Sequence, residues 1–276
     1  MKKTKSIIQL ARPVNVLISM LSIFIGAAIT GVLEPLENIL LASFSGGLIT
    51  AASNSINDYF DMEIDRINKP HRPLPSGAVS RNQCLTAALT EYMMGIGLSL
   101  FISAEMFIVA LIISILTFLY AARLKGTVLW GNLTVSFCTA AAFIYGGLSV
   151  NKPLEAIVPA CFAFFYHFGR EIIKDIQDVS GDSQQASNTM PVRFGVRPSV
   201  FLVWFNFLIL IVLTIIPYWT GWYGATYFLI VFFGIYPVII YTLVSILYNT
   251  TPKHLGFVSN LLKADMLIGL LAVYLR

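Results

Sequence analysis

The chain has 276 residues, of which 57% are hydrophobic and only 12% are charged. Soluble domains carry about 25% charged residues, so this composition excludes an ordinary soluble fold, a disordered chain and a collagen-like chain. The 18 Lys and Arg residues only slightly outnumber the 14 Asp and Glu residues and form no basic block, which argues against a nucleic-acid partner. The sequence therefore predicts a single membrane-embedded domain that covers residues 1–276.

A membrane-spanning helix needs about 20 mostly apolar residues, and nine segments of the chain fit this description. They cover residues 14–33, 37–56, 83–103, 105–122, 128–149, 154–173, 199–217, 222–248 and 256–275. Long, continuously apolar runs favour helices over the short alternating strands of a membrane β-barrel. We expect an all-α, polytopic membrane protein with nine transmembrane helices, the first of which is not cleaved.

The basic residues between these segments fall mostly on one side. With the N-terminus inside, 15 Lys and Arg residues lie in inner segments, and only Lys152 and Arg276 lie in outer ones. Because cytoplasmic loops are enriched in Lys and Arg, we expect a cell-membrane protein with a cytoplasmic N-terminus and an outer C-terminus. The two long loops at 57–82 and 174–198 are then cytoplasmic, and long loops in compact domains usually carry function.

Eight of the 14 acidic residues lie in two short windows, each at the inner end of a predicted helix. With one neighbouring amide, the polar residues of interest are Asn54, Asp58, Asp61 and Asp65 in the first window, and Glu171, Asp175, Asp178 and Asp182 in the second. Both sets have spacings of 4, 3 and 4 residues, so at about 100° per residue each set predicts one stripe along a helix. Gly181 favours a helix end just before Asp182.

Stripes of carboxylate and amide oxygens without His or Cys suit a hard cation, Mg²⁺ rather than Zn²⁺. A solvated helix end with salt bridges is the simpler interpretation of one stripe, but two matching stripes on one side of the membrane favour metal binding. Mg²⁺ is typically shared between carboxylates and a substrate phosphate, so we predict a diphosphate bound by metal at the two stripes. Basic residues near the acids are candidates for binding that diphosphate: Lys69, Arg72, Lys125, Arg170 and Lys174.

These residues resemble the motifs of the UbiA superfamily of intramembrane prenyltransferases. The first family motif, N-D-x-x-D-x-x-x-D, is matched from Asn57 to Asp65, and its continuation, D-R-x-x-K-P-x-R-P, from Asp65 to Pro73. The second acidic motif resembles the stretch from Asp175 to Asp182, and the stretches from Arg12 to Asn15 and from Tyr120 to Lys125 are also similar to family segments. The resemblance covers essentially the whole chain and implies the family's nine-helix fold and Mg²⁺-dependent transfer from a prenyl diphosphate.

The stretch from Gly169 to Asp182 looks most like the branch of the family that makes archaeal ether lipids. That resemblance implies transfer of a geranylgeranyl group to the hydroxyl of geranylgeranylglyceryl phosphate, a lipid-phosphate acceptor in the membrane, without a protein partner. The implied metal ligands are Asn54, Asp58, Asp61, Asp65, Asp175, Asp178 and Asp182. The implied catalytic residues are Asp58, Asp61, Asp65, Asp175 and Asp178, together with Glu171, which either takes the hydroxyl proton or supports the neighbouring groups.

Three alternatives to this function differ in class. An aromatic acceptor such as 4-hydroxybenzoate, as in quinone synthesis, is the alternative within the family. A CDP-alcohol phosphotransferase is disfavoured, because the run from Asp61 to Arg66 lacks the Gly and Ala of the expected D-G-x-x-A-R motif. A cation carrier would place its acids near the middle of the membrane, whereas these acids lie at inner helix ends. Metal-dependent turnover of a prenyl diphosphate distinguishes an enzyme from a carrier.

Overall fold

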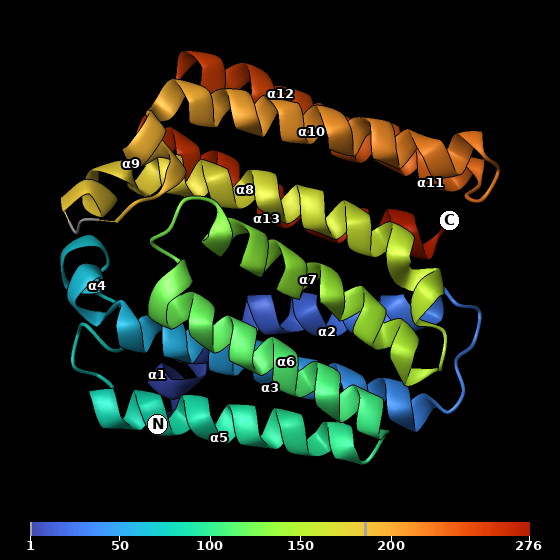
Figure 1. The fold of residues 1–276 in the computed structure, drawn as a ribbon, viewed down its shortest axis with the longest axis horizontal. Helices are drawn as coiled ribbons and strands as arrows, with labels where there is room; N and C mark the ends of the chain where they lie inside the picture. Colours follow the sequence, from blue (N-terminus) through green and yellow to red (C-terminus); the bar gives the residue numbers. More distant parts are fainter. Residues whose placement is uncertain (1, 185–186) are drawn as a thin grey trace. The chain divides into compact units, whose positions relative to one another are not determined.

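The computed structural model describes residues 2–184 and 187–276, and the secondary structure in these ranges is entirely helical (Figure 1). This confirms the predicted all-α class. The helices are α1 (Lys2–Ala11), α2 (Pro13–Ala28), α3 (Leu36–Phe60), α4 (Met62–Asn68), α5 (Arg81–Leu100), α6 (Ala104–Leu119), η1 (Tyr120–Leu124), α7 (Trp130–Ser149), η2 (Pro153–Ala156), α8 (Ile157–Gln184), α9 (Met190–Phe194), α10 (Val196–Trp219), α11 (Ala225–Ile230), η3 (Val231–Ile235), α12 (Tyr236–Tyr248) and α13 (Pro252–Tyr274).

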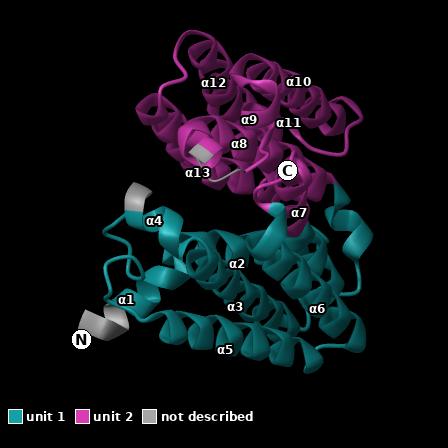
Figure 2. Cartoon of the chain, turned by 60° about the vertical axis from the view of Figure 1, so that its left-hand side comes forward, with its two compact units in different colours: residues 1–124, 141–157 teal, residues 125–140, 158–276 magenta. Residues whose placement is uncertain are grey.

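The chain divides into two compact units, which Figure 2 shows in different colours. Unit 1 consists of residues 1–124 and 141–157, and unit 2 consists of residues 125–140 and 158–276. Helix α7 belongs to both, because its first half is part of unit 2 and its second half is part of unit 1. The first acidic window lies in unit 1 and the second lies in unit 2.

Small residues allow the helices of unit 1 to pack closely. A side chain at Gly146 of α7 would collide with the backbone of Ile23 in α2, and a side chain at Gly95 of α5 would meet the backbone of Ser45 in α3 at 2.9 Å. The Ser45 hydroxyl donates to the Gly95 carbonyl oxygen at 2.7 Å and lies 2.9 Å from the Tyr145 hydroxyl. Such close contacts and interhelical hydrogen bonds hold helices together where lipid removes the hydrophobic driving force between them.

Unit 2 has its own apolar core. Its largest fully buried side chains come from α8, α10, α11 and α12, and they include Ile172, Ile176, Phe207, Tyr227 and Ile239. Other apolar side chains of this unit point outward, such as Phe201, which is 74% exposed, and Phe233, which is 71% exposed. Exposed apolar surface of this kind is expected where a helix faces lipid.

Seven helical segments in the described part of the chain are long and apolar enough to cross a membrane. They are Leu36–Phe60, Ala104–Leu124, Trp130–Ser149, Pro153–Ser183, Val196–Trp219, Ala225–Tyr248 and Pro252–Tyr274. The predicted count of nine is not confirmed. Helix α2 has 16 residues, which is about 24 Å and shorter than a bilayer core. Helix α5 carries the charged residues Arg81 and Glu91 among its 20 residues.

Three local expectations from the sequence were wrong. The stripe from Asn54 to Asp65 was expected on one helix, but α3 ends at Phe60 and α4 begins at Met62, with Asp61 between them at φ −83° and ψ 3°. Gly181 does not end α8, which continues to Gln184 because a glycine is tolerated within a helix. The expected loops at 57–82 and 174–198 are partly helical, since they contain α4, the end of α8 and α9.

The segment after α4 is an ordered turn rather than a free loop. Leu74 and Val79 are buried against Leu10 of α1 and Cys84 of α5. The backbone N–H of Val79 donates to the Pro73 carbonyl oxygen at 3.0 Å. Ser80 then starts α5 with a capping box, in which its side chain and that of Gln83 each accept from the other's backbone N–H. This packing fixes the path of the chain that carries Arg72.

Candidate active site

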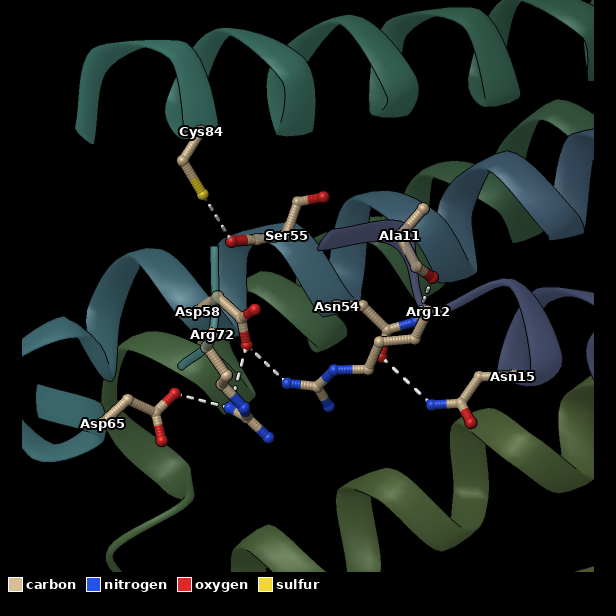
Figure 3. Close-up of polar contacts among 9 residues, drawn as sticks. All are labelled: Ala11, Arg12, Asn15, Asn54, Ser55, Asp58, Asp65, Arg72 and Cys84. Carbon is tan, nitrogen blue, oxygen red and sulfur yellow. Dashed lines mark hydrogen bonds and ion pairs between the residues drawn. The ribbon is translucent and has the colours of Figure 1, made fainter. Parts of the chain in front are cut away.

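In unit 1, Asp58 and Asp65 are brought together by one arginine (Figure 3). The Nη1 atom of Arg72 lies 3.1 Å from Oδ1 of Asp58 and 2.5 Å from Oδ2 of Asp65. Both aspartate side chains are 3% exposed, so these charges are removed from water. Asp58 and Asp65 therefore stay close together despite the break in the helix at Asp61, in agreement with the predicted stripe.

A second arginine contacts the same aspartate. The Nη2 atom of Arg12 lies 2.5 Å from Oδ1 of Asp58, the oxygen that Arg72 also contacts. Arg12 lies between α1 and α2, and its side chain is 31% exposed. The sequence analysis assigned no site role to Arg12, although it stands in one of the segments that resemble the family. Two guanidinium groups thus balance two buried carboxylates.

Asn54 holds the joint between α1 and α2. Its Nδ2 atom donates to the Ala11 carbonyl oxygen at 2.9 Å, and its Oδ1 atom accepts from Nδ2 of Asn15 at 3.4 Å (Figure 3). Asn54 is 7% exposed, so both contacts are shielded from water. Asn54, which the residue spacing predicts to be a metal ligand, therefore also fixes the backbone next to Arg12.

Asp61 and Lys69 lie at the two ends of α4. The Asp61 N–H donates to the Asn57 carbonyl oxygen at 2.9 Å, and the Asp61 carbonyl oxygen accepts from the Asp65 N–H at 2.8 Å. The Asp61 residue is 9% exposed. Lys69 ends the helix with its N–H bonded to the Asp65 carbonyl oxygen at 2.8 Å. Backbone hydrogen bonding therefore continues through the junction between α3 and α4 at Asp61.

In unit 2, the acids of α8 have separate partners. Asp175 Oδ2 accepts a hydrogen bond from Asn132 Nδ2 of α7 at 2.8 Å, and Asp182 Oδ2 accepts one from the Thr189 hydroxyl at 3.1 Å. Asp178 is exposed. Neither Asn132 nor Thr189 was predicted from the sequence to contact these acids. Asn132 is 6% exposed, and a polar amide in an apolar helix was the signal that could have indicated it.

Glu171 is buried between two basic residues of its own helix. Its Oε2 atom accepts from Lys174 Nζ at 2.7 Å, and its Oε1 atom lies 3.3 Å from Nη1 of Arg170. The Arg170 side chain is 14% exposed, and its Nε atom donates to the Ser259 carbonyl oxygen of α13 at 3.1 Å. Arg170 therefore links Glu171 to a neighbouring helix, whereas Lys174, at 38% exposure, is accessible.

Lys125 begins unit 2 and is exposed. The carbonyl oxygen of the next residue, Gly126, accepts a hydrogen bond from the Asn188 N–H at 2.7 Å. A side chain at position 126 would lie 3.3 Å from the Ser187 hydroxyl, which is tighter than ordinary packing. Gly126 thus allows the segment of Lys125 to lie against Ser187 and Asn188.

The oxygen donors of unit 1 fit a hard divalent cation. Asp58 and Asp65 both reach one nitrogen atom of Arg72, so a positive group at that point contacts both carboxylates. Carboxylate oxygens are the ligands that Mg²⁺ prefers. Among the described residues, no group of three or more His, Cys, Asp or Glu side chains is close enough together to hold a metal ion. Arg72 occupies the point at which the two acids converge, and Arg12 contacts Asp58.

Comparisons with known proteins agree with these motifs. Residues 19–261 match the UbiA prenyltransferase family. The digeranylgeranylglyceryl phosphate synthase of Methanopyrus kandleri is 33% identical over 268 residues, which cover 97% of each chain. A solved structure described for digeranylgeranylglyceryl phosphate synthase in membranes is 30% identical, has a TM-score of 0.78, and is matched over 99% of this chain and 98% of its own.

A more distant solved structure shares the fold. The UbiA homologue from Archaeoglobus fulgidus, bound to DMAPP and Mg²⁺, has a TM-score of 0.68 at 21% identity, with 95% of this chain and 98% of that chain covered. The family match covers most of the chain, and its all-helical, multi-pass architecture agrees with the apolar helices described above. The chain is therefore a multi-pass membrane protein that belongs to the UbiA prenyltransferase family.

Proposed function

We propose that this protein transfers a geranylgeranyl group from geranylgeranyl diphosphate to the hydroxyl of geranylgeranylglyceryl phosphate, which forms an ether lipid of the archaeal type. The proposal is supported by the relative from Methanopyrus kandleri, whose name states this class of synthase. The observation that carries it is the convergence of Asp58 and Asp65 on one cationic atom, because that arrangement can bind a metal and a diphosphate. The whole chain, residues 1–276, acts as one prenyltransferase domain.

Two sets of ligands are proposed for Mg²⁺. In unit 1 they are Asn54, Asp58, Asp61 and Asp65, and in unit 2 they are Asp175, Asp178 and Asp182. When bound, Mg²⁺ supplies Lewis-acid stabilisation of the negative charge on the leaving diphosphate. The Archaeoglobus fulgidus homologue, solved with DMAPP and Mg²⁺, supports this choice of metal. The hydrogen bond from Asn132 fixes Asp175, and that from Thr189 fixes Asp182.

The residues proposed to bind the diphosphate are Lys69, Arg72, Lys125, Arg170 and Lys174. Arg72 is supported best, because its guanidinium already lies between two acids and can bind phosphate oxygens in a bidentate manner. Lys125 and Lys174 are accessible, which suits a charge that meets a substrate. Arg170 is largely buried and contacts both Glu171 and the Ser259 carbonyl oxygen of α13, so it also holds Glu171 in place.

The chemistry follows from where these charges lie. The bond between the allylic carbon and the diphosphate oxygen breaks, and its electron pair leaves with the diphosphate, whose charge the basic residues stabilise. The acceptor hydroxyl oxygen attacks the allylic cation and forms the ether bond, and its proton passes to the leaving diphosphate. Glu171 is proposed as a positioning residue near this step. Because both of its oxygens contact cations, we infer that it positions Lys174 and Arg170 rather than taking the proton.

The proposed membrane topology has nine transmembrane helices. Seven segments are long and apolar enough to cross a membrane, and helices α2 and α5 are proposed as the other two transmembrane helices. The excess of Lys and Arg on one side supports a cytoplasmic N-terminus, cytoplasmic acidic motifs and an outer C-terminus. On this topology the acids lie at the cytoplasmic surface, where a soluble metal and a released diphosphate have access.

The test uses the purified full-length protein in lipid nanodiscs with geranylgeranyl diphosphate and Mg²⁺. Geranylgeranylglyceryl phosphate and 4-hydroxybenzoate are offered separately, and the products are identified by mass spectrometry. The expected result is an ether product with the glyceryl phosphate that disappears with EDTA and with Asp58→Asn. Glu63→Gln is the matched control, because Glu63 lies in the same motif but its side chain is 73% exposed and pairs with the exposed Arg66.

A product with the aromatic acid alone would replace the acceptor and keep the prenyl transfer. Absence of product with either acceptor would instead support a cation carrier if the protein, reconstituted into liposomes, also conducts cations across the membrane. A phosphoester product from a CDP-alcohol would overturn the reaction class.

A further inference from the structure

Arg12 is held in an unusual backbone conformation beside the first acidic motif. Its φ of 52° and ψ of 73° lie in the left-handed region, which a residue with a Cβ rarely adopts. Pro13 follows it, so the chain turns at this residue from α1 into α2. The bend is fixed by the Asn54 amide on the Ala11 carbonyl and by the Asn15 N–H, which donates to the Arg12 carbonyl oxygen at 2.8 Å. Such conformations persist where surrounding contacts enforce them, and they cluster at functional sites.

The bend directs the Arg12 guanidinium onto Asp58. Arg12 and Arg72 contact the same oxygen of Asp58, and Arg72 also contacts Asp65, so two positive charges balance two buried negative charges (Figure 3). The Arg12 side chain is 31% exposed, whereas the Asp58 side chain is 3% exposed. The carboxylate is therefore fixed in the protein, and the guanidinium is the partner with room to move.

This balance has a consequence for a divalent cation. A cation that binds Asp58 and Asp65 competes with both arginines for the same oxygens, and it adds positive charge where the charges are already balanced. Two guanidinium groups next to a metal repel it unless an anion joins them. A diphosphate is such an anion, and arginine binds phosphate oxygens in a bidentate manner.

We propose that Arg12 and Arg72 are exchangeable counter-ions, which release the acids when Mg²⁺ binds and then bind the diphosphate of the substrate. Arg12 thereby becomes a diphosphate-binding residue that lies outside the acidic motif. This inference rests on the proposed function, because it takes a prenyl diphosphate as the substrate. It requires that Mg²⁺ and the diphosphate strengthen each other's binding, since each relieves the charge imbalance that the other creates.

The test measures Mg²⁺ binding by isothermal titration calorimetry on the full-length protein in nanodiscs. One titration is run without added anion, and a second is run with geranylgeranyl S-thiolodiphosphate, a slowly reacting substrate analogue. The analogue also binds Mg²⁺ in solution, and the same titration of Asp58→Asn protein measures that contribution so that it can be subtracted. In the wild type we expect the analogue to tighten Mg²⁺ binding by about tenfold or more, within the usual range of coupling between two ligands.

Arg12→Gln removes one competing cation. We therefore expect this variant to bind Mg²⁺ several-fold more tightly than the wild type when the analogue is absent. We also expect the analogue to increase its Mg²⁺ affinity much less than it does in the wild type. Arg12→Gly is the second variant, because glycine adopts a positive φ without strain and so preserves the bend. Arg66→Gln is the matched control, since Arg66 pairs with the exposed Glu63 and should change neither affinity. Unchanged or weaker Mg²⁺ binding in both Arg12 variants, with the tightening intact, would overturn the proposal.

The same proteins separate this inference from the proposed function. If the wild type forms the ether product while both Arg12 variants retain full coupling, the exchange of counter-ions is wrong and the function stands. If the wild type binds Mg²⁺ and the analogue cooperatively but forms no prenylated product, the proposed reaction is wrong and the exchange stands.

Discussion

The two acidic motifs have the same residue spacing but different local structures. In unit 1 the helix breaks at Asp61, and Asp58 and Asp65 converge on Arg72. In unit 2 helix α8 is continuous, and Asp175 and Asp182 bond to separate neutral partners, Asn132 and Thr189. Identical spacing therefore predicts which face of a helix carries acids, but the surrounding side chains decide whether those acids are paired with cations or with neutral donors.

This difference predicts different sensitivities to substitution. Unit 1 depends on charge balance, because removing a carboxylate leaves two arginines with one partner fewer. In unit 2, Asp175 and Asp182 depend on orientation, because each accepts a hydrogen bond from a neutral side chain.

Asp58→Asn is expected to reduce kcat/KM for prenyl transfer by about 100-fold or more, because the residue is proposed both to hold the metal and to balance two arginines. Initial rates at several Mg²⁺ concentrations measure the change. Activity within twofold of wild type, at the Mg²⁺ concentration that saturates the wild type, would remove Asp58 from the site. Glu63→Gln should leave the rate unchanged.

Asn132→Leu is expected to reduce activity by about 10-fold, because Asp175 loses the hydrogen bond that orients it. Loss of a residue that orients a metal ligand typically lowers metal affinity or activity by about 10- to 100-fold. The Mg²⁺ concentration for half-maximal rate should rise more than KM for the prenyl diphosphate. Thr134→Val on the same helix is the control, because the Thr134 hydroxyl is exposed and bonds to the Trp130 carbonyl oxygen of its own helix. An equal loss in both variants would point to general damage to α7.

Glu171→Gln is expected to reduce kcat by several-fold without changing the shape of the pH–rate profile. The substitution keeps the volume of the side chain but leaves Lys174 and Arg170 without their shared carboxylate. A profile measured from pH 5.5 to 9 checks this. Disappearance of one limb of the profile would show that Glu171 takes the acceptor's proton, contrary to the positioning role inferred here.

Tyr166→Phe is expected to lower the free energy of unfolding by about 1 kcal/mol with little effect on activity. The Tyr166 hydroxyl lies 3.0 Å from the Leu262 carbonyl oxygen and 2.8 Å from Oδ2 of Asp265, so its removal leaves a buried acid of α13 without a partner. Thermal unfolding in nanodiscs measures the change, and Tyr248→Phe, at an 86% exposed position, is the control. A large loss of activity at unchanged stability would assign Tyr166 to the site instead.

Much of the fold could be predicted because the apolar runs are long. All nine predicted segments contain a helix in the structure. Their ends differ by a few residues, except that the sixth segment was predicted to end at residue 173 and α8 continues to Gln184. The ends that were wrong depend on local conformation. Asp61 breaks a helix that its neighbours favour, and Gly181 continues a helix that it was expected to end. Neither outcome follows from helical periodicity, because both depend on what the adjacent segments pack against.

The acidic residues of the candidate site could be predicted from the sequence, but the side chains that contact them could not. The motif spacing identified Asp58 and Asp65, and their common contact with Arg72 agrees with the predicted single face. Arg12 and Asn132 were missed because they lie 46 and 43 residues away in sequence from the acids that they contact. Contacts at such separations arise from tertiary packing, and spacing within one helix carries no information about them.

The most direct test of the proposed function is a competition between acceptors in one reaction. Wild-type protein in nanodiscs is given geranylgeranyl diphosphate and Mg²⁺ with equal concentrations of geranylgeranylglyceryl phosphate and 4-hydroxybenzoate, and both products are quantified by mass spectrometry. Our account predicts that the ether lipid is by far the major product and that EDTA abolishes it. A prenylated aromatic acid as the major product, or an ether yield that EDTA does not change, would contradict the account.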